Sequence, residues 1–526
     1  MKAPYRIIAL ILLVLLSFSL LASCGGSGET TPATTPDAGT TAAPKVDKWE
    51  GVDFTGKTLH VEYSTHTLTQ LTAEGADNFN QYLVGPDDYS SNAVANAVFE
   101  RNNRVYERLG FEIDFMETDL VGTTDFMPHF ESVSLAEIPP DVIVHQHYGL
   151  VRAAVSGLLY NLREDYGDSA KNLFDFDGED SDNWYKNLME STTLNKEKLY
   201  IAASDFLFDS LRLSYNVFVN VDMFGELFSV QGGMNYLYDL VLDPQGDDAW
   251  TYDKLQELTG VLDGFSETDA DVIYGAVSTT SAYRSFFYSS GLAIFDYDEN
   301  GTPSYIVSAE AKQDLHNYVD KMMSLYSSEL FFITDYEKRS QTFQNGKALF
   351  MTDQFLAALE GSSFLNMDNA AGVLPFPKYD TSKEYSSLVA DNACSGAILY
   401  ASQQFRMATA YLQMMTEESD EVRYQYFDQG LKLKNNSSND ARQVEVLDII
   451  HAAVSTSNPL PFLFDNLCSR NLPAAEGSNV SSAYTIYDII QYSVNGNTNI
   501  FSSVWDSEVT AKNNELQRVI GIFNDK

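Results

Sequence analysis

The sequence is short of the residues on which metal centres and nucleic-acid binding depend. Only three of its 526 residues are cysteine and seven are histidine, and no CxxC or paired Cys/His spacing indicates a zinc site. Lysine and arginine number 33 against 74 aspartates and glutamates, so the formal net charge is −41. Because such a surface repels phosphates, we expect no binding to nucleic acid or to anionic lipid headgroups.

Recognisable enzyme motifs are also missing. No GxSxG, Walker A, HExxH or GxGxxG motif stands out. The sequence has no repeat of fixed period, which argues against a solenoid or a propeller. The absence of these motifs does not exclude an enzyme, but it removes the clearest sequence arguments for one. No cofactor is expected, and the expectation that the protein is not an enzyme rests on the segments described below.

The first residues have the order of a secretory signal peptide. Lys2 and Arg6 precede an apolar run over 7–21. That run of about fifteen residues is short for a membrane span, which needs about 20. The stretch LASC, which ends at Cys24, resembles a bacterial lipobox. The resemblance implies that 1–23 is a lipoprotein signal peptide and that acyl chains on Cys24 anchor the protein to the extracytoplasmic face of a membrane.

Residues 24–48 are the lipidated cysteine and a flexible linker. They are rich in Gly, Thr, Pro and Ala and carry no apolar period. A chain of this length reaches roughly 25–30 Å, so the folded body begins near Trp49.

The other two cysteines are Cys394 and Cys468. In an exported protein they can form a disulfide, or they can be two buried thiols that pack as small apolar side chains. The sequence leaves both alternatives open.

The body shows alternating strand and helix patterns. Strands are predicted at 57–63, 111–115 and 141–144, and helices at 90–109, with Ser90 or Ser91 as cap and Gly110 as stop, and at 149–159. Two further helical stripes are Leu315, Tyr318, Met322 and Leu325, and Phe405, Ala408, Leu412 and Met415. Alternation of this kind predicts an α/β fold, and about 480 residues are too many for one core.

His145, Gln146 and His147 follow an apolar strand. Two histidines at this spacing share a face and could hold a metal with a third ligand. They also lie where open α/β sheets bind ligands, beyond the carboxyl end of a strand. We predict contact with a ligand here rather than a metal site.

The acidic stretch 296–301 (DYDENG) is similar to the start of a calcium-binding EF-hand loop. Val307 stands where that loop needs its bidentate glutamate. A turn between two strands is therefore predicted instead.

Five segments, in order, resemble the family 1 extracellular solute-binding proteins of ABC importers, the group that includes maltose-binding protein. They are 139–162, 198–227 with its Tyr215-Asn216 pair, 340–359 with Gly346-Lys347-Ala348, 371–380 and 388–415. The resemblance implies an α/β, two-lobed, periplasmic-binding-protein-like fold with a hinge and an interlobe cleft. Lobe one would hold 49–209 plus 375–455, and lobe two 211–372 plus 456–526.

The resemblance also places the ligand-binding residues. The positions that match are His145, Gln146 and Tyr148 in the first ligand loop, Asp209 at the hinge crossing, Tyr283, Arg284 and Tyr288 in a lobe-two aromatic segment, Phe355, Asn392 and Tyr484. Asp209 would accept hydrogen bonds from sugar hydroxyls. Phe355 stands where a stacking tryptophan is often found, so it keeps the ring face and loses the indole donor.

These features together predict a monomeric, lipid-anchored solute-binding subunit that passes its solute to the permease subunits of an ABC importer. With 31 tyrosines and only 4 tryptophans, a sugar or oligosaccharide is the expected ligand, since tyrosine rings stack on sugars while their hydroxyls hydrogen-bond.

A polyamine or other cationic solute is the alternative, which a pocket with several buried acids and no arginine would favour. A lipid-anchored surface glycoside hydrolase would need two facing carboxyls about 5–10 Å apart. A surface adhesin would lack a closing cleft.

Overall fold

The computed structural model describes residues 47–64, 80–89, 91–118, 120, 126–178, 183–243, 248–262, 272–328, 330–355, 367, 370–434, 441–456, 460–468 and 483–524. The predicted signal peptide, Cys24 and the linker up to residue 46 lie outside these residues. The chain divides into two units, Met1–Val52 and Asp53–Lys526. In the first, the described residues 47–52 form a turn, and everything below concerns the second.

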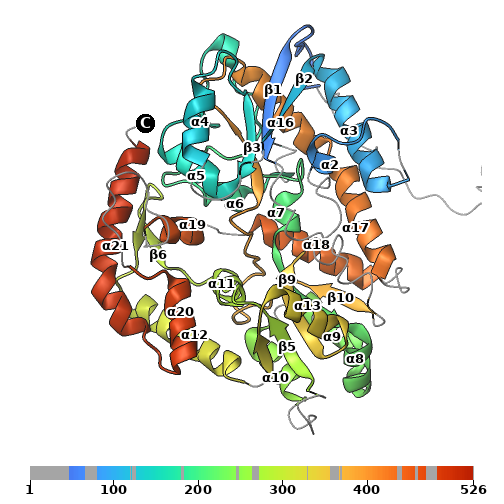
Figure 1. Cartoon of the computed structure of the whole chain (residues 1–526), viewed down its shortest axis with the longest axis vertical. Coiled ribbons are helices and arrows are strands. Elements are labelled where there is room, and N and C mark those ends of the chain that lie inside the picture. Colours follow the sequence, from blue (N-terminus) through green and yellow to red (C-terminus); the bar gives the residue numbers. More distant parts are fainter. Residues whose placement is uncertain are drawn as a thin grey trace, which may run out of the picture. The chain divides into compact units, whose positions relative to one another are not determined.

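Lobe one is built on a four-stranded sheet (Figure 1). Its strand order is β11-β3-β1-β2, with β1 at Thr58–Ser64, β2 at Glu112–Thr118, β3 at Val142–Gln146 and β11 at Cys394–Ile398. β1 is parallel to both β2 and β3, and β11 returns antiparallel to β3. The three strands predicted in the first part of the body are confirmed.

Helices from distant parts of the sequence complete lobe one around this sheet. They are α2 (Asn80–Leu83), α3 (Ala93–Leu109), α4 (Phe126–Ser134), α5 (His147–Val155), α6 (Lys186–Glu190), α16 (Phe405–Glu417) and α17 (Asp420–Lys434), with a 3₁₀ turn at Asp168–Ala170. α16 packs on β11 and α3, and α17 packs on α3.

Local chemistry explains the ends of α3. Asn92, rather than the predicted Ser90 or Ser91, caps the helix, because its side-chain oxygen accepts the N–H groups of Val94 and Ala95 at 2.9 and 3.1 Å. The predicted stop is confirmed: Gly110 has φ 74°, in the left-handed region that glycine adopts without a steric cost.

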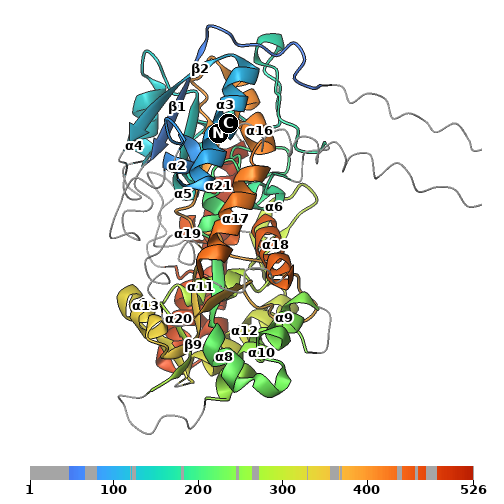
Figure 2. The same ribbon diagram turned by 90° about the vertical axis from the view of Figure 1, so that its right-hand side faces the viewer.

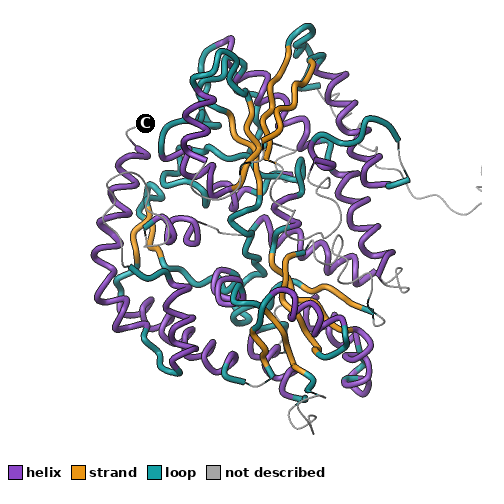
Figure 3. Tube along the Cα trace, viewed as in Figure 1, coloured by secondary structure: helices purple, strands orange, loops and turns teal. Residues whose placement is uncertain are grey.

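Lobe two is built on a five-stranded sheet, and Figure 3 shows its strands as a group apart from those of lobe one. The order is β10-β4-β9-β5-β8, with β4 at Tyr215–Asn220, β5 at Tyr274–Ser278, β8 at Phe331–Ile333, β9 at Ala348–Gln354 and β10 at Ala371–Leu374. β5 is parallel to β8 and β9, whereas β4 runs antiparallel to β9 and β10. Its core includes Phe218, Val277, Phe343 and Met351.

The remaining elements extend lobe two. The helices are α8 (Val221–Leu227), a 3₁₀ turn (Ser229–Gln231), α9 (Met234–Leu242), α10 (Tyr252–Gly260), α11 (Ala282–Tyr288), α12 (Ala309–Tyr326), α13 (Tyr336–Gln344), α19 (Leu460–Leu467), α20 (Ile486–Gly496) and α21 (Phe501–Asn524). β6 (Phe295–Tyr297) and β7 (Pro303–Tyr305) form an antiparallel hairpin, so the turn predicted at 296–301 is confirmed. None of the helices within the described ranges is long and apolar enough to cross a membrane.

The chain passes between the lobes in segments that bond to one another. The Tyr215 N–H donates to the Leu388 carbonyl at 3.0 Å, and the Ala390 N–H donates to the Leu213 carbonyl at 3.1 Å. The Phe355 N–H donates to the Ser214 carbonyl at 2.8 Å. Three crossings, near residues 214, 355 and 389, are therefore held side by side, and α7 (Asp209–Arg212) precedes the first of them.

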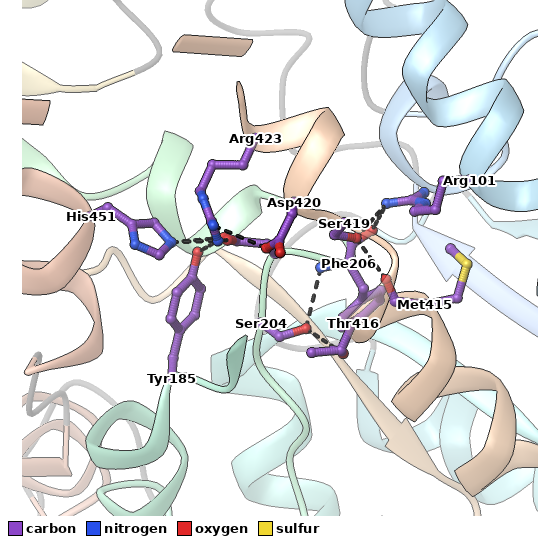
Figure 4. A network of polar contacts seen from close by, with 11 residues as sticks. Arg101, Tyr185, Ser204, Phe206, Met415, Thr416, Ser419, Asp420, Arg423 and His451 are labelled. Atoms are coloured by element: carbon purple, nitrogen blue, oxygen red, sulfur yellow. Dashed lines mark hydrogen bonds and ion pairs between the residues drawn. The ribbon is translucent and has the colours of Figure 1, made fainter. Parts of the chain in front are cut away.

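A polar network fixes the chain just before α7 (Figure 4). Arg101 is fully buried and donates to the Phe206 carbonyl at 2.8 Å and to the Ser419 hydroxyl at 3.1 Å. The Asp205 carboxylate accepts from Arg423 at 2.6 Å and is 2.9 Å from His451 Nε2.

The Asp205 carboxylate also receives the Tyr185 hydroxyl. Burial alone would raise the pKa of Asp205, but His451, Arg423 and Tyr185 together lower it to about 2. Asp205 is thus a buried anion that joins α17 to α18 (Ala441–Ser455).

Two long helices contact both lobes. α18 packs on α6 and α7 and also on α9 and β10. α21 packs on α12, α20 and β7 in lobe two and on α5 in lobe one. It runs along the left side of Figure 1 and lies at the back of Figure 2, behind α17. At its end, the Lys198 ammonium donates to the Phe523 and Asn524 carbonyls at 3.0 and 3.3 Å, where a cation also complements the helix dipole.

The two described cysteines, Cys394 and Cys468, are both buried and are not joined by a disulfide. Of the two alternatives left open by the sequence, the structure therefore confirms two buried thiols. Burial raises the pKa of the Cys468 thiol well above its usual range, so this thiol is poorly reactive.

A buried ion pair holds the last helices of lobe two together. Lys512 and Asp465 are both almost fully buried and in contact. The Asp465 carboxylate also accepts the Tyr305 hydroxyl and the Ile486 N–H, each at 2.8 Å. Four segments of the chain, β7, α19, α20 and α21, thus meet at one carboxylate.

We predict that Lys512→Met lowers the free energy of unfolding by about 3–5 kcal/mol, because it leaves the Asp465 charge buried without its cation. Urea denaturation followed by circular dichroism measures this. Lys312→Met is the matched control. Lys312, on α12, forms a more exposed ion pair with Asp506, which lies on the same helix α21 as Lys512. Such a pair contributes at most about 1 kcal/mol to stability. Equal effects from the two variants would contradict the prediction.

Candidate functional site

Polar and aromatic side chains from both lobes lie within electrostatic reach of one another, and we call this group the interlobe cluster. Its members are Tyr148 and Asp391 from lobe one and Tyr215, Arg284, Tyr336 and Tyr487 from lobe two. Asp391 acts electrostatically on both Tyr148 and Arg284, so it links the two halves. The cluster combines hydrogen-bonding groups of both signs with aromatic faces.

The lobe-one half depends on the start of α5. Strand β3 continues through His145 and Gln146, and α5 begins at once with His147. The Tyr148 N–H donates to the Asp391 carbonyl at 3.2 Å, which places Tyr148 beside the segment that leads into β11. Arg152, one helical turn later, donates to the Tyr148 hydroxyl at 3.4 Å.

The lobe-two half is centred on Arg284. This residue of α11 is half-buried, and its guanidinium lies over the Tyr487 ring of α20 at 5.5 Å. Tyr215 begins β4 and is only 7% exposed, while Tyr336 begins α13 and is 56% exposed. The lobe-two members of the cluster therefore range from the buried Tyr215 to the exposed Tyr336.

The protonation states of the cluster follow from this setting. Burial would lower the pKa of Arg284, but Tyr215, Asp391 and Tyr487 outweigh it and raise the pKa. Burial raises the pKa of Tyr148 and raises that of Tyr215 to about 12. At neutral pH the cluster thus holds a cationic arginine and tyrosine hydroxyls that keep their protons to donate.

A second arginine lies beside Tyr336. Arg339, on α13, is 3% exposed, contacts the Asp353 carboxylate at the end of β9, and has its guanidinium 5.1 Å from the centre of the Tyr336 ring. Asp353 in turn acts electrostatically on Tyr215. The Arg339–Asp353 pair therefore adjoins the lobe-two half of the cluster.

Several residues predicted to bind ligand lie in or next to the cluster. Tyr148 and Arg284 are members. The Tyr283 ring is 6.2 Å from that of Tyr487, and Asn392 follows Asp391 in the chain. The structure thus brings together four predicted residues from three segments that are distant in the sequence.

His145 and Gln146 lie elsewhere. His145 is fully buried in β3, with its ring edge-on to Phe126 at 4.5 Å and Phe130 at 5.3 Å. Its Nδ1 accepts the Gln146 N–H at 3.0 Å, and the Gln146 side chain is 9% exposed. His145 is part of the lobe-one core.

Asp209 has no exposed surface. One oxygen accepts from Arg212 at 3.0 Å and the other accepts the Cys394 N–H at 2.6 Å. Its position at the crossing is as predicted, but the structure gives both of its oxygens partners inside the protein.

The last three predicted positions are also in packed surroundings. Phe355 is 1% exposed and packs on Tyr426 and Phe427, with centroids 6.2 Å apart in each case. Tyr288 is 7% exposed. The Tyr484 ring packs on Tyr492 at 5.5 Å, and its carbonyl accepts from Lys512.

Neither histidine 145 nor the acidic turn at 296–301 belongs to a metal centre in the structure. Within the described ranges, no group of three or more His, Cys, Asp or Glu residues could hold a metal ion.

Sequence reasoning did not select Tyr215, Tyr336, Asp391 or Tyr487. Signals for two of them were present. Tyr215 begins the Tyr-Asn pair at the hinge, and Asp391 precedes the selected Asn392. Tyr336 and Tyr487 stand at or near helix starts, which no local pattern marks as facing another lobe.

Comparisons with known proteins bear on the fold. No model of a protein family matches the chain, and no curated protein matches it. The maltose-binding periplasmic protein MalE from Listeria monocytogenes, solved with maltose, superposes with a TM-score of 0.53 at 13% identity, covering 88% of this chain and 98% of that one. This chain has the two-lobed periplasmic-binding-protein fold. The GacH receptor of Streptomyces glaucescens GLA.O, solved unliganded and with acarbose, covers 88% and 99% at 13% identity, with a TM-score of 0.44.

The buried histidines predict a pH dependence of stability. Burial lowers the pKa of His145 to about 3, with the charge of His129 as a smaller cause, and burial lowers that of His147 to about 4. The unfolded chain takes up these protons near pH 6.5 and the folded chain does not, so stability is present above pH 6.5 and falls as the pH drops towards 4.

His145→Leu should therefore reduce the loss of unfolding free energy between pH 6 and pH 4 by about 1.4 kcal/mol per pH unit. Urea denaturation at a series of pH values measures the slope. The control is Val144→Ala in the same strand, which removes no titratable group and should leave the slope unchanged. An unaltered slope in His145→Leu would count against the buried, neutral state of this ring.

Proposed function

We propose that the protein is a lipid-anchored extracytoplasmic solute-binding subunit of an ABC importer, and that it captures a sugar or oligosaccharide. The observation that carries the proposal is the interlobe cluster, in which both lobes of a periplasmic-binding-protein fold supply groups suited to a polyhydroxyl ligand. Arg284 and the tyrosine hydroxyls donate, Asp391 accepts, and the rings of Tyr336 and Tyr487 offer faces for stacking.

In this proposal the ligand stabilises the closed form. A ligand held by Tyr148 and Asp391 on one side and by Arg284 and Tyr487 on the other gains its full set of contacts only when the lobes approach. Closure also removes water, which strengthens each hydrogen bond. A permease that recognises the closed form would then receive loaded protein.

The alternatives fit the cluster less well. A polyamine would meet the cationic Arg284. A glycoside hydrolase needs two facing carboxyls, whereas the Asp353 carboxylate is held by Arg339 and is not available beside Asp391. A solute-binding protein without catalytic activity therefore remains the proposal.

We expect at least one oligosaccharide of a neutral and acidic panel to bind in isothermal titration calorimetry, and small-angle scattering to show a smaller radius of gyration when it does. Arg284→Gln should weaken that binding about 10- to 100-fold, because hydrogen bonds to a charged group contribute about 1.5–3 kcal/mol. The control is Arg104→Gln, which changes an exposed arginine paired with Glu418. The proposal fails if no carbohydrate binds, or if a polyamine binds and none of the saccharides does.

Anchoring is tested separately through Cys24. Cys24→Ala should move the protein from the membrane to the soluble fraction, because no acyl chain can then be attached. Fractionation and incorporation of labelled palmitate measure this, with Cys468→Ala as the matched control that keeps both membrane association and label. Membrane retention of Cys24→Ala would rule out the lipid anchor.

A further inference from the structure

The Arg339 side chain has more donors than the protein uses. It is 3% exposed, and its Nη2 contacts Asp353 and lies 3.5 Å from the Ser340 hydroxyl. Nε and Nη1, although buried, have no hydrogen-bond partner anywhere in the described part of the chain. A buried donor without a partner destabilises the folded protein, so such groups call for an acceptor from outside the chain.

The surroundings of Arg339 join it to the interlobe cluster. Its guanidinium faces the Tyr336 ring, which is 56% exposed, so the buried charge lies next to a surface edge. Tyr336 and Tyr215 both act electrostatically on Arg284, and Asp353 acts on Tyr215. Tyr336 is therefore a common neighbour of the two arginines, because the Arg339 guanidinium lies over its ring and Tyr336 acts electrostatically on Arg284.

The sign of the charge here differs from that of the whole protein. Among the residues that the structure describes, the charged groups of the cluster and its immediate partners are the guanidiniums of Arg152, Arg284 and Arg339 and the carboxylates of Asp353 and Asp391. The chain as a whole carries a formal net charge of −41. A local excess of arginine in so acidic a protein marks a place where negative charge is received, and guanidinium binds carboxylate better than ammonium does.

We propose that the ligand is an acidic saccharide, a uronate-containing sugar whose carboxylate binds the guanidiniums of Arg339 and Arg284 while its ring stacks on the tyrosines of the cluster. This inference rests on the proposed function, since it assigns the class of sugar within the same site. Arg339 then serves as the residue that distinguishes acidic from neutral sugars.

The first experiment compares matched ligands by isothermal titration calorimetry on the full chain. The probes are trigalacturonate and the neutral galactotriose with the same linkage. We expect trigalacturonate to bind about 100-fold more tightly, with an affinity that falls as salt rises. Equal binding of both, or binding of neutral sugars alone, overturns this inference and leaves the proposed function intact. Absence of binding by every saccharide overturns the proposed function itself.

The second experiment removes the charges at Arg339. Arg339→Gln alone would leave the Asp353 carboxylate buried without its cation, so Asp353→Asn is added to keep the pair neutral. The double variant should lose about 10- to 100-fold in affinity for the acidic probe and less than about 3-fold for any neutral sugar that binds. Arg339→Lys keeps the charge but not the planar guanidinium, so its affinity for the acidic probe should lie between those of the unchanged protein and the double variant.

Lys338→Gln is the control, because it changes an exposed cation one residue away on the same helix. It should leave the affinity for the acidic probe unchanged. Circular dichroism checks that each variant folds, and if the double variant does not, Arg339→Lys gives the reading instead, because it keeps a cation beside Asp353 and removes only the planar fork. Unchanged discrimination in the folded variants would overturn the assignment.

Discussion

The carboxylate of Asp209 connects the segments on which the placement of both lobes depends. It holds its own helix through Arg212 and holds the first residue of β11 through the Cys394 N–H. β11 completes the sheet of lobe one, whereas α7 leads directly into β4 of lobe two. One buried anion therefore fixes where lobe one ends relative to where lobe two begins.

The backbone before Asp209 is strained to reach this position. Phe208 has φ 63°, a left-handed conformation that a bulky residue rarely adopts. Its ring packs between those of Tyr82 and Tyr426, with centroids 6.1 and 5.8 Å away, and this packing offsets the strain. The Asp205 network, a few residues earlier, prevents the segment from relaxing. Rigidity at the crossing keeps the Tyr215 N–H bonded to the Leu388 carbonyl and so fixes the start of β4 against the segment that leads to Asp391.

Much of the fold could be predicted because its signals are local. Each of three predictions depended on a short segment alone: the period of two in β1, the stop at Gly110 and the helical stripe at 315–325. The two lobes were predicted from the five family-like segments and their order in the chain. The interlobe cluster was predicted only in part, because tertiary packing decides its membership. Arg284 and Tyr336 are more than fifty residues apart in sequence, and only the fold brings them together.

Asp209 shows the same difficulty for a single residue. A carboxylate at a crossing can face a ligand or the interior, and the choice depends on whether internal donors reach it. One of them, Arg212, was visible three residues later as a possible pair on one turn of helix. The other, the Cys394 amide, lies 185 residues away and could not be foreseen.

The attachment of α21 to Lys198 has a mechanical consequence. The helix is rooted in lobe two, and its last carbonyls are held by a lysine of lobe one, with the Phe523 ring 5.2 Å from that of Tyr200. When one lobe rotates relative to the other, the contact between Lys198 and the end of α21 must either break or lie on the axis of the rotation. If the contact holds, α21 restrains the bending of the crossings, and the lobes can then only rotate about an axis that passes through this contact. The crossings then set the direction of the movement, and the far end of one helix sets its range.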